Sequence, residues 1–496
     1  MSGRKFLLRI NDADSVAVAL DSLSAGETHE VCGDSVTLSD DIPFGHKVAL
    51  RDIPAGSDVI KYGYPIGHAA FDIRKGQHVH THNVRTNLAG VVKYTYNPRT
   101  YPLFPARNAS FDGYLRPDGS VGVRNEVWII PTVGCVNNTA KLLEKEAASR
   151  FTGMCDGVYA FTHNMGCSQL GDDMLRTQKL LAGLVRHPNA AGVLVLSLGC
   201  ENNNLDEFKK VLGDADDNRV KFLVTQDSRD EIEDGLSILE QLVDMASAQK
   251  RQTVPANKLI TGFKCGGSDA FSGITANALC GRVNDIIVSC GGTTMLTEVP
   301  EMFGAETILM NRAVNEGVFD DIVRLINGFK GYFTRYNQEI YENPSPGNKK
   351  GGITTLEEKS LGCTQKGGQA PVAGVLDYGD RVVPGGLNLL NGPGNDQVSC
   401  TNLAAAGCQI ILFTTGRGNP FGCPVPTVKL SSNSRLAHNK PNWIDFDAGR
   451  LLDGGDFDGL GDELFNYILE VASGRLTRNE MYGYREISVF RDGVIL

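Results

Sequence analysis

One short pattern occurs three times near the start of the chain and restricts what this region can fold into. It reads DIPFGHKV from Asp41, DIPAGSDV from Asp52 and DIRKGQHV from Asp72. In each copy a glycine, which permits a positive φ, precedes a valine by three residues, so a tight turn leads into a strand. The repeat therefore predicts a small all-β domain with Val48, Val59 and Val79 on its core side.

The third copy runs into GQHVHTHN, which places His78, His80 and His82 at alternate positions. Alternate side chains of a strand share one face, so three imidazoles in line resemble a metal site. Such a row spans about 13 Å at ~3.3 Å per residue, and one ion would reach two neighbouring rings and hardly all three. The valines place His78 and His80 opposite the core with Lys47, facing outward or toward another domain.

Beyond this region the pattern of the sequence changes. KYTYNPRTYPLFPAR, from residue 93, has three prolines and no periodicity, which is typical of a linker. Apolar runs at 127–133, 157–162 and 192–198 then end in glycine-containing loops, and a helix is expected after each one. We therefore predict a multidomain α/β protein, with ranges as follows: an all-β domain at 1–92, a linker at 93–112, a middle α/β domain at 113–254, and a larger α/β domain with a mostly parallel sheet at 255–496.

Length and charge agree with this division. A chain of 496 residues corresponds to about three domains of ordinary size. Its net charge of -10 argues against nucleic acid or an anionic membrane as partner. It has no apolar run near the roughly 20 residues of a membrane span, and its N-terminus does not resemble a signal peptide. Twelve cysteines without a CxxC pair fit a reducing compartment. A cytoplasmic protein acting on a small molecule is expected.

Three predicted strands end in related loops, IIPTVGCVNN, AFTHNMGCSQ and VLSLGCENN, which contain Cys135, Cys167 and Cys200. Ligands of open parallel sheets bind beyond the carboxyl ends of the strands, and a helix N-terminus stabilises a thiolate. The alternative is that each sulfur packs against the sheet behind a compact Gly-Cys turn. His163, four residues before Cys167, favours a functional loop, although a structural histidine is an equal alternative.

The last domain begins with FKCGGSDAFSGITAN, which matches neither a P-loop nor GxGxxG. Cys265 ends its apolar run, and Ser268 and Asp269 add polar groups to a loop that suits an anion. TEVPEMFG then supplies Glu298 and Glu301 for hard-cation ligation or acid/base work, although glutamates at strand ends are usually solvated.

Two long irregular loops contain cationic side chains. NPSPGNKKGGITT (343–355) contains Asn348, Lys349 and Lys350, and TTGRGNPFGCPVPT (414–427) contains Arg417. Arg and Lys pair with carboxylates, and Asn meets hydroxyl groups, so these loops suit an acidic, hydroxylated ligand.

Many long motifs, in one order from about residue 5 to the C-terminus, resemble the altronate and galactarate dehydratase family. They are GHKVAL, VIKYGYPIG, DGSVGVRNE, TVGCVN, GCSQLGDD, LGCENN, CGGSDAFSGITAN, EVPEMFGAE, NPSPGNKKGGITTLEEKSLGCTQK and TTGRGNP. GQHVHTHN, VRHPNA and EKSLGCTQK are closer to its altronate-specific members.

The resemblance implies a hydro-lyase of hexuronate catabolism that converts D-altronate into 2-keto-3-deoxy-D-gluconate. It implies an N-terminal β-clip domain of the SAF type, a middle domain that contributes to a homodimer, and a Rossmann-like C-terminal domain. It also implies a requirement for Fe(2+), with Mn(2+) as a replacement.

Dehydration of a 2,3-dihydroxy acid needs a base for the C2 proton, help for the departing hydroxide and cations for the carboxylate. We assign His46 and His163 as acid/base candidates and Lys47 and Arg417 as carboxylate ligands. His80 is expected to enter the substrate pocket from a closing β domain. The further substrate-binding candidates are Ser268, Asp269, Asn348 and Lys349. The iron-ligand candidates are Cys135, Cys167, Cys200, Cys265 and Glu298, since Fe(II) accepts sulfur, nitrogen or oxygen.

Three alternatives remain open at this point. One is a dehydratase of galactarate or another aldarate. Another is an iron-sulfur hydro-lyase, because three Gly-Cys loops could hold a cluster with one open iron, although the resemblance does not favour it. The third, from a different class, is a sugar-acid binding protein without turnover.

Overall fold

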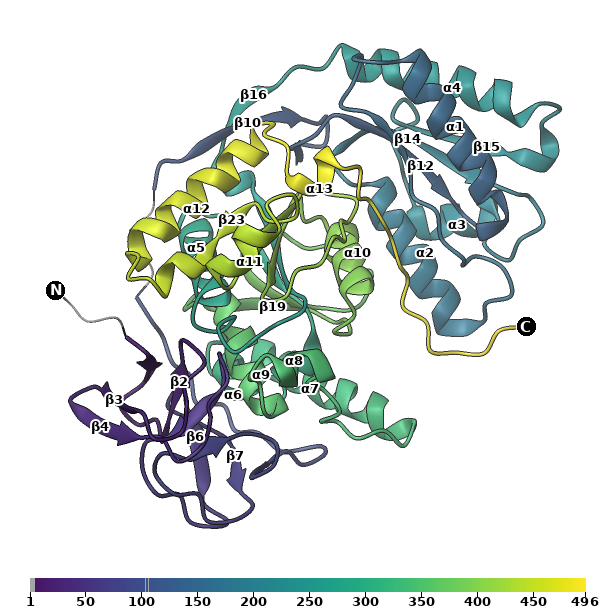
Figure 1. Ribbon diagram of the computed structural model, residues 1–496. Coiled ribbons are helices and arrows are strands. Elements are labelled where there is room, and N and C mark those ends of the chain that lie inside the picture. Colours follow the sequence, from purple (N-terminus) through teal and green to yellow (C-terminus); the bar gives the residue numbers. More distant parts are fainter. Residues whose placement is uncertain (1–4, 103, 106) are drawn as a thin grey trace.

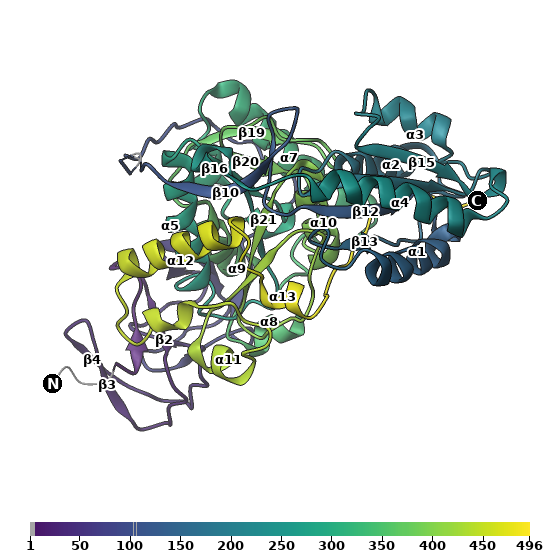
Figure 2. The same ribbon diagram turned by 90° about the horizontal axis from the view of Figure 1, so that it is seen from above.

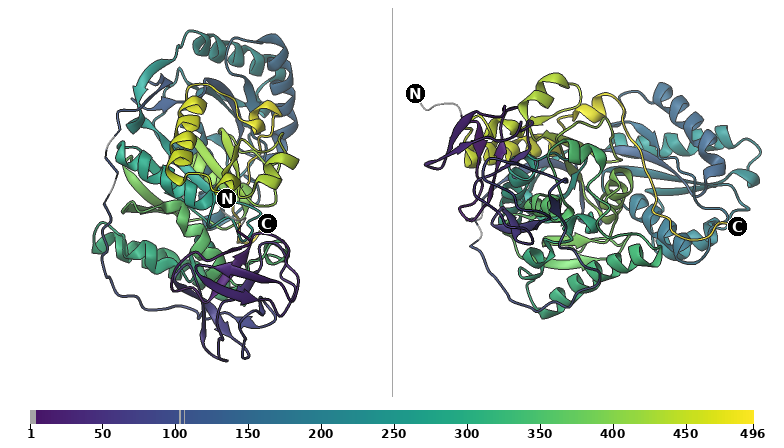
Figure 3. Two further views of the ribbon diagram at one scale, coloured as in Figure 1. Left: turned by 60° about the vertical axis from the view of Figure 1, so that its left-hand side comes forward. Right: turned by 60° about the horizontal axis from the view of Figure 1, so that its bottom comes forward.

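The computed structural model describes residues 5–102, 104–105 and 107–496 in three domains. The C-terminal domain lies between the other two, with the β domain at one end and the middle domain at the other (Figures 1 and 2). The linker runs along the outside of the C-terminal domain (Figure 3), and its positions 103 and 106 are outside the described residues. No helix in the described part of the chain is both long and apolar enough to cross a membrane.

From residue 5 onward, the β domain contains nine short strands in antiparallel sheets of order β1-β2-β5-β8, β3-β4 and β6-β7-β9. Their bounds are β1 (Leu7–Leu8), β2 (Val16–Ala19), β3 (Thr28–Val31), β4 (Asp34–Thr37), β5 (Lys47–Ala49), β6 (Asp58–Lys61), β7 (Tyr64–Ala69), β8 (His78–Val79) and β9 (Val84–Arg85). The prediction of a small all-β domain is confirmed. The repeat glycines Gly45, Gly56 and Gly76 have φ of 80°, 79° and 88°, as their turns require.

The prediction that the three repeat valines share one core side is wrong. All three are fully buried, but Val48 packs with Val31 and Val36, whereas Val59 and Val79 belong to a second cluster. The reason is that both faces of the β1-β2-β5-β8 sheet are covered, one by the β3-β4 hairpin and the other by the β6-β7-β9 sheet. Alternation along a strand cannot identify a solvent face when neither face is exposed.

The GQHVHTHN segment is not one straight strand either. Strand β8 ends at Val79, and the next residues turn, with the Asn83 N–H donating to His80 O at 3.0 Å. The turn brings the His82 ring to 5.2 Å from the His78 ring, centroid to centroid. The in-line spacing expected for the three histidines therefore does not apply.

The middle domain has a four-stranded parallel sheet of order β13-β12-β14-β15. The bounds are β12 (Glu126–Pro131), β13 (Val158–Ala160), β14 (Ala190–Ser197) and β15 (Val220–Val224), with helices α1 (Asn137–Arg150), α2 (Gly171–Val185), α3 (Leu205–Leu212) and α4 (Glu231–Ser247). A small antiparallel sheet joins the segments that enter and leave this domain, namely β10 (Ser110–Leu115), β11 (Val121–Gly122) and β16 (Gln252–Pro255).

The C-terminal domain has a seven-stranded sheet of order β19-β20-β18-β17-β21-β22-β23, parallel throughout. Its strands are β17 (Ile260–Cys265), β18 (Thr293–Leu296), β19 (Val372–Leu376), β20 (Gly386–Leu390), β21 (Ile410–Thr415), β22 (Thr427–Ser431) and β23 (Phe446–Asp447). Its helices are α5 (Ala276–Ser289), α6 (Glu306–Met310), α7 (Glu316–Arg335), α8 (Pro346–Lys350), α9 (Leu356–Cys363), α10 (Asp396–Ala406), α11 (Ser434–Asn439), α12 (Phe457–Ala472) and α13 (Arg478–Met481). The predicted α/β class is confirmed.

One apolar core crosses from the middle domain into the C-terminal domain. It includes Trp128 and Leu180 on one side and Leu403 and Phe413 on the other. Helices α2 and α10 approach so closely that a Cβ on Gly183 would lie 2.4 Å from a backbone oxygen. These two domains are packed as one body, and the β domain docks on it.

Candidate active site between the β domain and the C-terminal domain

A fully buried ion triad joins the β domain to helix α9. Lys47 Nζ lies 2.9 Å from Glu358 Oε2, and Lys61 Nζ lies 2.7 Å from Glu358 Oε1. Burial would raise the pKa of Glu358, but the two ammonium groups outweigh it and lower the pKa to about 2. Burial lowers the pKa of Lys47 to about 8 despite the same carboxylate, because one glutamate cannot fully compensate two lysines.

Three histidines of the β domain gather beside this triad. His46 Nδ1 lies 3.0 Å from His78 Nε2, and His46 Nε2 lies 3.3 Å from Lys350 O of the C-terminal domain. His80 Nδ1 lies 3.0 Å from Thr354 Oγ1. Burial lowers the pKa of His46, of His78 to about 4 and of His80 to about 3, so all three rings are neutral near pH 7. The histidine face is turned toward the C-terminal domain.

Two glycines let the backbones of the two domains meet here. A Cβ on Gly352 would lie 2.2 Å from Gly45 O, and Gly352 has φ of 96°. A Cβ on Gly45 would lie 3.3 Å from Gly351 O. The first repeat turn and the segment after α8 therefore need glycine at their contact.

Beneath this contact lies a buried group of two thiols and a carboxylate. Cys265 Sγ is 3.4 Å from Cys363 Sγ, and Glu301 Oε2 is 3.3 Å from the first sulfur and 3.1 Å from the second. In the described chain this is the only set of three His, Cys, Asp or Glu side chains whose ligand atoms all lie within 4.8 Å of one another. The Cys265 contact and burial raise the pKa of the Cys363 thiol well above its usual value.

Three lysines and three carboxylates surround the thiols, so the positive and negative charges around them are equal in number. Lys264 pairs with Glu298 and Asp396, Lys366 with Glu298, and Lys359 with Glu301. Although burial and Glu301 raise the pKa of Glu298, its two ammonium contacts favour the ionised form. With three charges of each sign, loss of both thiol protons would leave two negative charges. One divalent cation would neutralise them.

An open cavity of about 520 Å³ lies at the same domain contact, where Gly351 borders it. Four cationic side chains line it, together with Asp269 and Asn433: Lys350, Arg417, Arg435 and Lys440. Phe44 of the β domain and Phe271 add an apolar wall. A hollow of about 10 Å³, about the room for one water, lies between the cavity and the thiols. Asp269 borders it on the cavity side and Cys363 on the thiol side. Charge and size suit a small carboxylate with hydroxyl groups.

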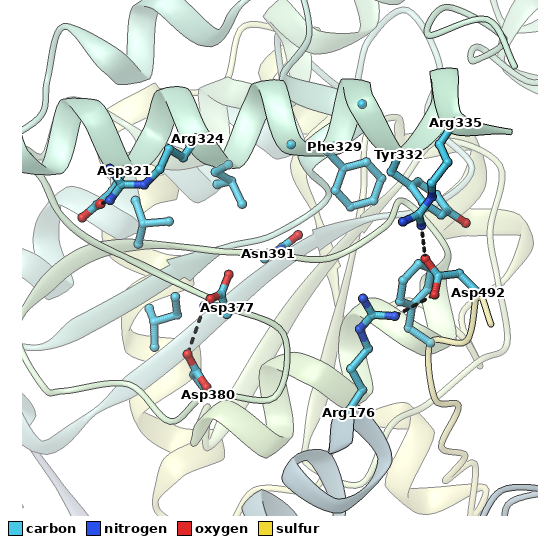
Figure 4. A pocket seen from close by; sticks show the side chains of 16 residues that line it. Arg176, Asp321, Arg324, Phe329, Tyr332, Arg335, Asp377, Asp380, Asn391 and Asp492 are labelled. Atoms are coloured by element: carbon cyan, nitrogen blue, oxygen red, sulfur yellow. Dashed lines mark hydrogen bonds and ion pairs between the residues drawn. The ribbon is translucent and has the colours of Figure 1, made fainter. Parts of the chain in front are cut away.

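A larger cavity of about 640 Å³ lies elsewhere, among α2, α7 and the C-terminal segment (Figure 4). Its arginines are engaged with acidic side chains: Asp492 contacts Arg176 at 2.8 Å and Arg335 at 2.5 Å, and Arg324 pairs with Asp321. None of the residues singled out in the sequence lines it. We therefore take the cavity at the domain contact as the candidate substrate site.

The structure brings most of the sequence-derived candidates together at this contact. These are His46, Lys47, His80, Cys265, Ser268, Asp269, Glu298, Asn348, Lys349 and Arg417. Ser268 Oγ lies 3.1 Å from Cys265 Sγ, and Asn348 Nδ2 donates to Ser268 O at 2.8 Å. Lys349 is half-buried in α8. Lys47 already uses Gly352 O, Thr354 Oγ1 and Glu358 as partners, so it is not free to hold a carboxylate.

Four candidates are in the middle domain instead. Cys135, Cys167 and Cys200 are exposed there and do not meet Cys265. His163 is buried, with Nε2 donating to Pro131 O at 2.8 Å and Nδ1 accepting from Met165 N at 3.1 Å. Both ring nitrogens are used by the backbone, which fits the structural histidine considered as the alternative.

Several residues of the site were not singled out from the sequence: Glu358, Lys359, Cys363, Lys264 and Lys366. Three of them lie on α9, where every residue is buried. A run such as LEEKS reads as a solvated helix surface, and no local signal marks it as interior. Glu298 and Glu301, expected to be solvated, are 1% and 3% exposed.

Comparison with known proteins covers each domain. Three family models match: "Altronate/galactarate dehydratase SAF domain" at residues 5–87, "D-galactarate dehydratase/Altronate hydrolase, second domain" at 113–247, and "D-galactarate/Altronate dehydratase, C-terminal" at 256–495. The chain is 51% identical to an altronate dehydratase of Bacillus subtilis, over 99% of this chain and 100% of that one. It is 50% identical to one of Escherichia coli, over 99% of each chain. A galactarate dehydratase (L-threo-forming) of Escherichia coli is 34% identical over 98% of this chain and 96% of that one.

Proposed function

This chain belongs to the altronate/galactarate dehydratase family, and we propose that it is a hydro-lyase that removes water from D-altronate to form 2-keto-3-deoxy-D-gluconate. The observation that carries the proposal is the cationic cavity of about 520 Å³, whose lining residue Lys350 has its backbone oxygen 3.3 Å from Nε2 of the neutral His46. Identity of about half to altronate dehydratases, against 34% to the galactarate enzyme, favours altronate as the substrate.

The cavity residues have distinct parts in this reaction. Arg417 and Lys350 bind the carboxylate, while Asn433 and Asp269 meet the hydroxyl groups of the sugar chain. His46 takes the C2 proton. Lys350 O can only accept a hydrogen bond, so Nε2 carries the ring proton at the 3.3 Å contact, and the accepting lone pair of the neutral ring is on Nδ1, 3.0 Å from His78 Nε2. The C3 hydroxide then leaves, and the enol becomes the 2-keto acid.

The Cys265, Glu301 and Cys363 group fits divalent iron. Its donors are two sulfurs and a carboxylate oxygen, which borderline-soft Fe(II) accepts, and Thr297 Oγ1 beside it is buried without a hydrogen-bond partner. When bound, iron supplies Lewis-acid stabilisation of negative charge on the substrate. Mn(II) is expected to bind less well, because sulfur ligands suit it poorly.

The substrate assignment is tested with a panel of sugar acids. The protein, supplied with Fe(II) under reducing conditions, is expected to form 2-keto product from altronate much faster than from galactarate. Arg417→Ala should raise KM for altronate by about tenfold or more, because a charged contact to the carboxylate is lost. Arg324→Ala, in the other cavity, is the matched control. Preference for galactarate, or altronate binding without product, would refute the proposal.

The iron assignment is tested by metal content. Cys363→Ser should lower bound iron and should weaken the sulfur-to-metal absorption of a cobalt-substituted sample, whereas Cys280→Ser, another buried thiol, should not. Full turnover after thorough chelation, or unchanged metal binding in Cys363→Ser, would exclude this site.

We also propose that the chain forms a homodimer and acts in the cytoplasm. The acidic net charge of -10 and the absence of a membrane-crossing helix among the described residues are compatible with it. Sedimentation of the purified chain tests the oligomeric state.

A further inference from the structure

The three Gly-Cys loops of the middle domain meet at one edge of its sheet. Strands β13, β12 and β14 are neighbours and parallel, so their carboxyl ends lie on the same side. Cys167, Cys135 and Cys200 follow these strands in that order across the sheet. Three thiols from distant parts of the chain are thus presented on one surface.

Hydrogen bonds fix these loops to one another. Gly134 N donates to Met165 O at 3.0 Å, Asn203 N to Gly166 O at 2.9 Å, and Ser168 N to the Asn202 side chain at 2.8 Å. The buried Glu201 carboxylate accepts from Thr132, Ser197, Leu198 and Gly199. The backbone that carries the thiols is preorganised.

The glycine before each cysteine is explained by this loop packing. A Cβ on Gly166 would lie 2.0 Å from Thr132 O, one on Gly134 2.8 Å from His163 O, and one on Gly199 2.8 Å from the Gln226 side chain. The cysteines themselves have no such explanation. All three are exposed, so their sulfurs are not packed against the sheet, and they make up three of the four exposed cysteines in the described chain. Exposed free thiols are unusual in a protein without a use for them.

The surroundings favour a negatively charged ligand. Helices α1, α2 and α3 all begin at this edge, shortly after Cys135, Cys167 and Cys200, so three positive helix ends converge on it. The cysteine ligand atoms do not all lie within 4.8 Å of one another, which disfavours a single ion. A cluster with several irons lets each thiolate bind a different iron, so the sulfurs need not converge on one point.

We propose that Cys135, Cys167 and Cys200 hold an iron-sulfur cluster of the [4Fe-4S] type, with three irons bound by cysteine and the fourth open to an exchangeable ligand. The site is separate from the Cys265, Glu301 and Cys363 group, because it lies on the middle domain and is open to solvent.

The test is anaerobic reconstitution of the full chain with equal amounts of ferrous and ferric iron and with sulfide, which together supply the two Fe(II), two Fe(III) and four sulfides of the cluster. The wild-type chain should take up about four acid-labile sulfides, with visible absorption that bleaches on reduction. The Cys135→Ser/Cys167→Ser/Cys200→Ser variant should fall to the reagent blank, and each single variant should lose most of the cluster. Cys32→Ser, the other exposed thiol, should match the wild type.

The Cys363→Ser variant separates this inference from the proposed function. Cys363→Ser should keep its full sulfide content, and sulfide that depends on Cys363 would overturn the inference. The inference is also overturned if the wild type takes up no labile sulfide, or if the triple variant takes up as much as the wild type. It is overturned as well if the triple variant loses iron but keeps its labile sulfide. Altronate turnover is measured separately on the same samples. The triple variant should keep the far-ultraviolet circular dichroism of the wild type, since its positions are exposed.

Discussion

At the scale of single residues, burial decides the charge states of the site. His46, His78 and His80 are held neutral, while Glu358 is held ionised by two lysines. Burial and the charge of Lys47 keep the His46 ring in its unprotonated form, which is the form that a general base needs.

His46→Ala is expected to lower kcat by about 10²–10⁴-fold, the usual contribution of a general base. Bound iron and the far-ultraviolet circular dichroism should be unchanged, because the iron ligands and the ion triad do not include this ring. His438→Ala serves as the control, because this side chain is exposed and does not line the cavity. A near-normal kcat would remove His46 from the mechanism.

At the scale of elements, helix α9 connects the two parts of the site. From one face it gives Glu358 to the lysines of the β domain, and from another it gives Lys359 and Cys363 to the buried thiol group. Its N-terminus is capped by the Thr355 side chain, which accepts from Glu358 N. Glu358 and Lys359 can be buried in this way only because each is paired with an opposite charge from outside the helix.

Glu358→Gln is expected to lower the free energy of unfolding by about 3–5 kcal/mol, because it leaves two lysines buried without a counter-charge. Urea unfolding measures this loss. The neighbouring Glu357→Gln is the matched control. Burial raises the pKa of Glu357, and its contacts are to Thr86 and Asn87 rather than to a cation, so a smaller loss is expected. If both variants lost the same free energy of unfolding, the ion triad would not be what stabilises the docked β domain.

At the scale of the whole molecule, the site exists only while the β domain is docked. The middle and C-terminal domains share one large apolar core, whereas the β domain is held by buried ion pairs, close backbone approach and two smaller apolar clusters. The ion pairs are sensitive to a change of charge, and they lie at the candidate active site.

Acid is expected to weaken the docking of the β domain on the C-terminal domain. The docked pKa values of His78 and His80, about 4 and about 3, lie below the ordinary 6.5. Their contribution to docking is therefore complete above pH 6.5 and is lost as the pH falls below it toward 4. The groups facing them include Lys47, Glu358, Asp40 and His82. Lys47 adds to the repulsion when the rings become charged.

Hydrogen exchange of α8 and α9, corrected for intrinsic rates, measures this effect. Protection should be lower at pH 5 than at pH 7.5, and the difference should shrink in His78→Asn/His80→Asn. Equal protection of the wild type at both values would show that the histidines do not control docking.

The sequence alone determined the elements and their classes. The repeated glycine turns predicted the β domain, and apolar runs ending in loops predicted the parallel α/β domains, because turns and strands depend on residues near one another in the chain. It also located the loops of the site, at Cys265, Glu298, Asn348 and Arg417, since parallel strands carry their functional residues at their carboxyl ends.

The tertiary structure alone decided which of these residues work together. Lys47 meets Glu358 across 311 positions of sequence, and Cys265 meets Cys363 across 98. Nothing near α9 in the sequence shows that its charges are buried, and nothing near His163 shows that its ring is used by the backbone. Burial and charge pairing are properties of contacts between distant segments, so only the folded chain separates the docked site of His46 from the exposed edge of Cys135.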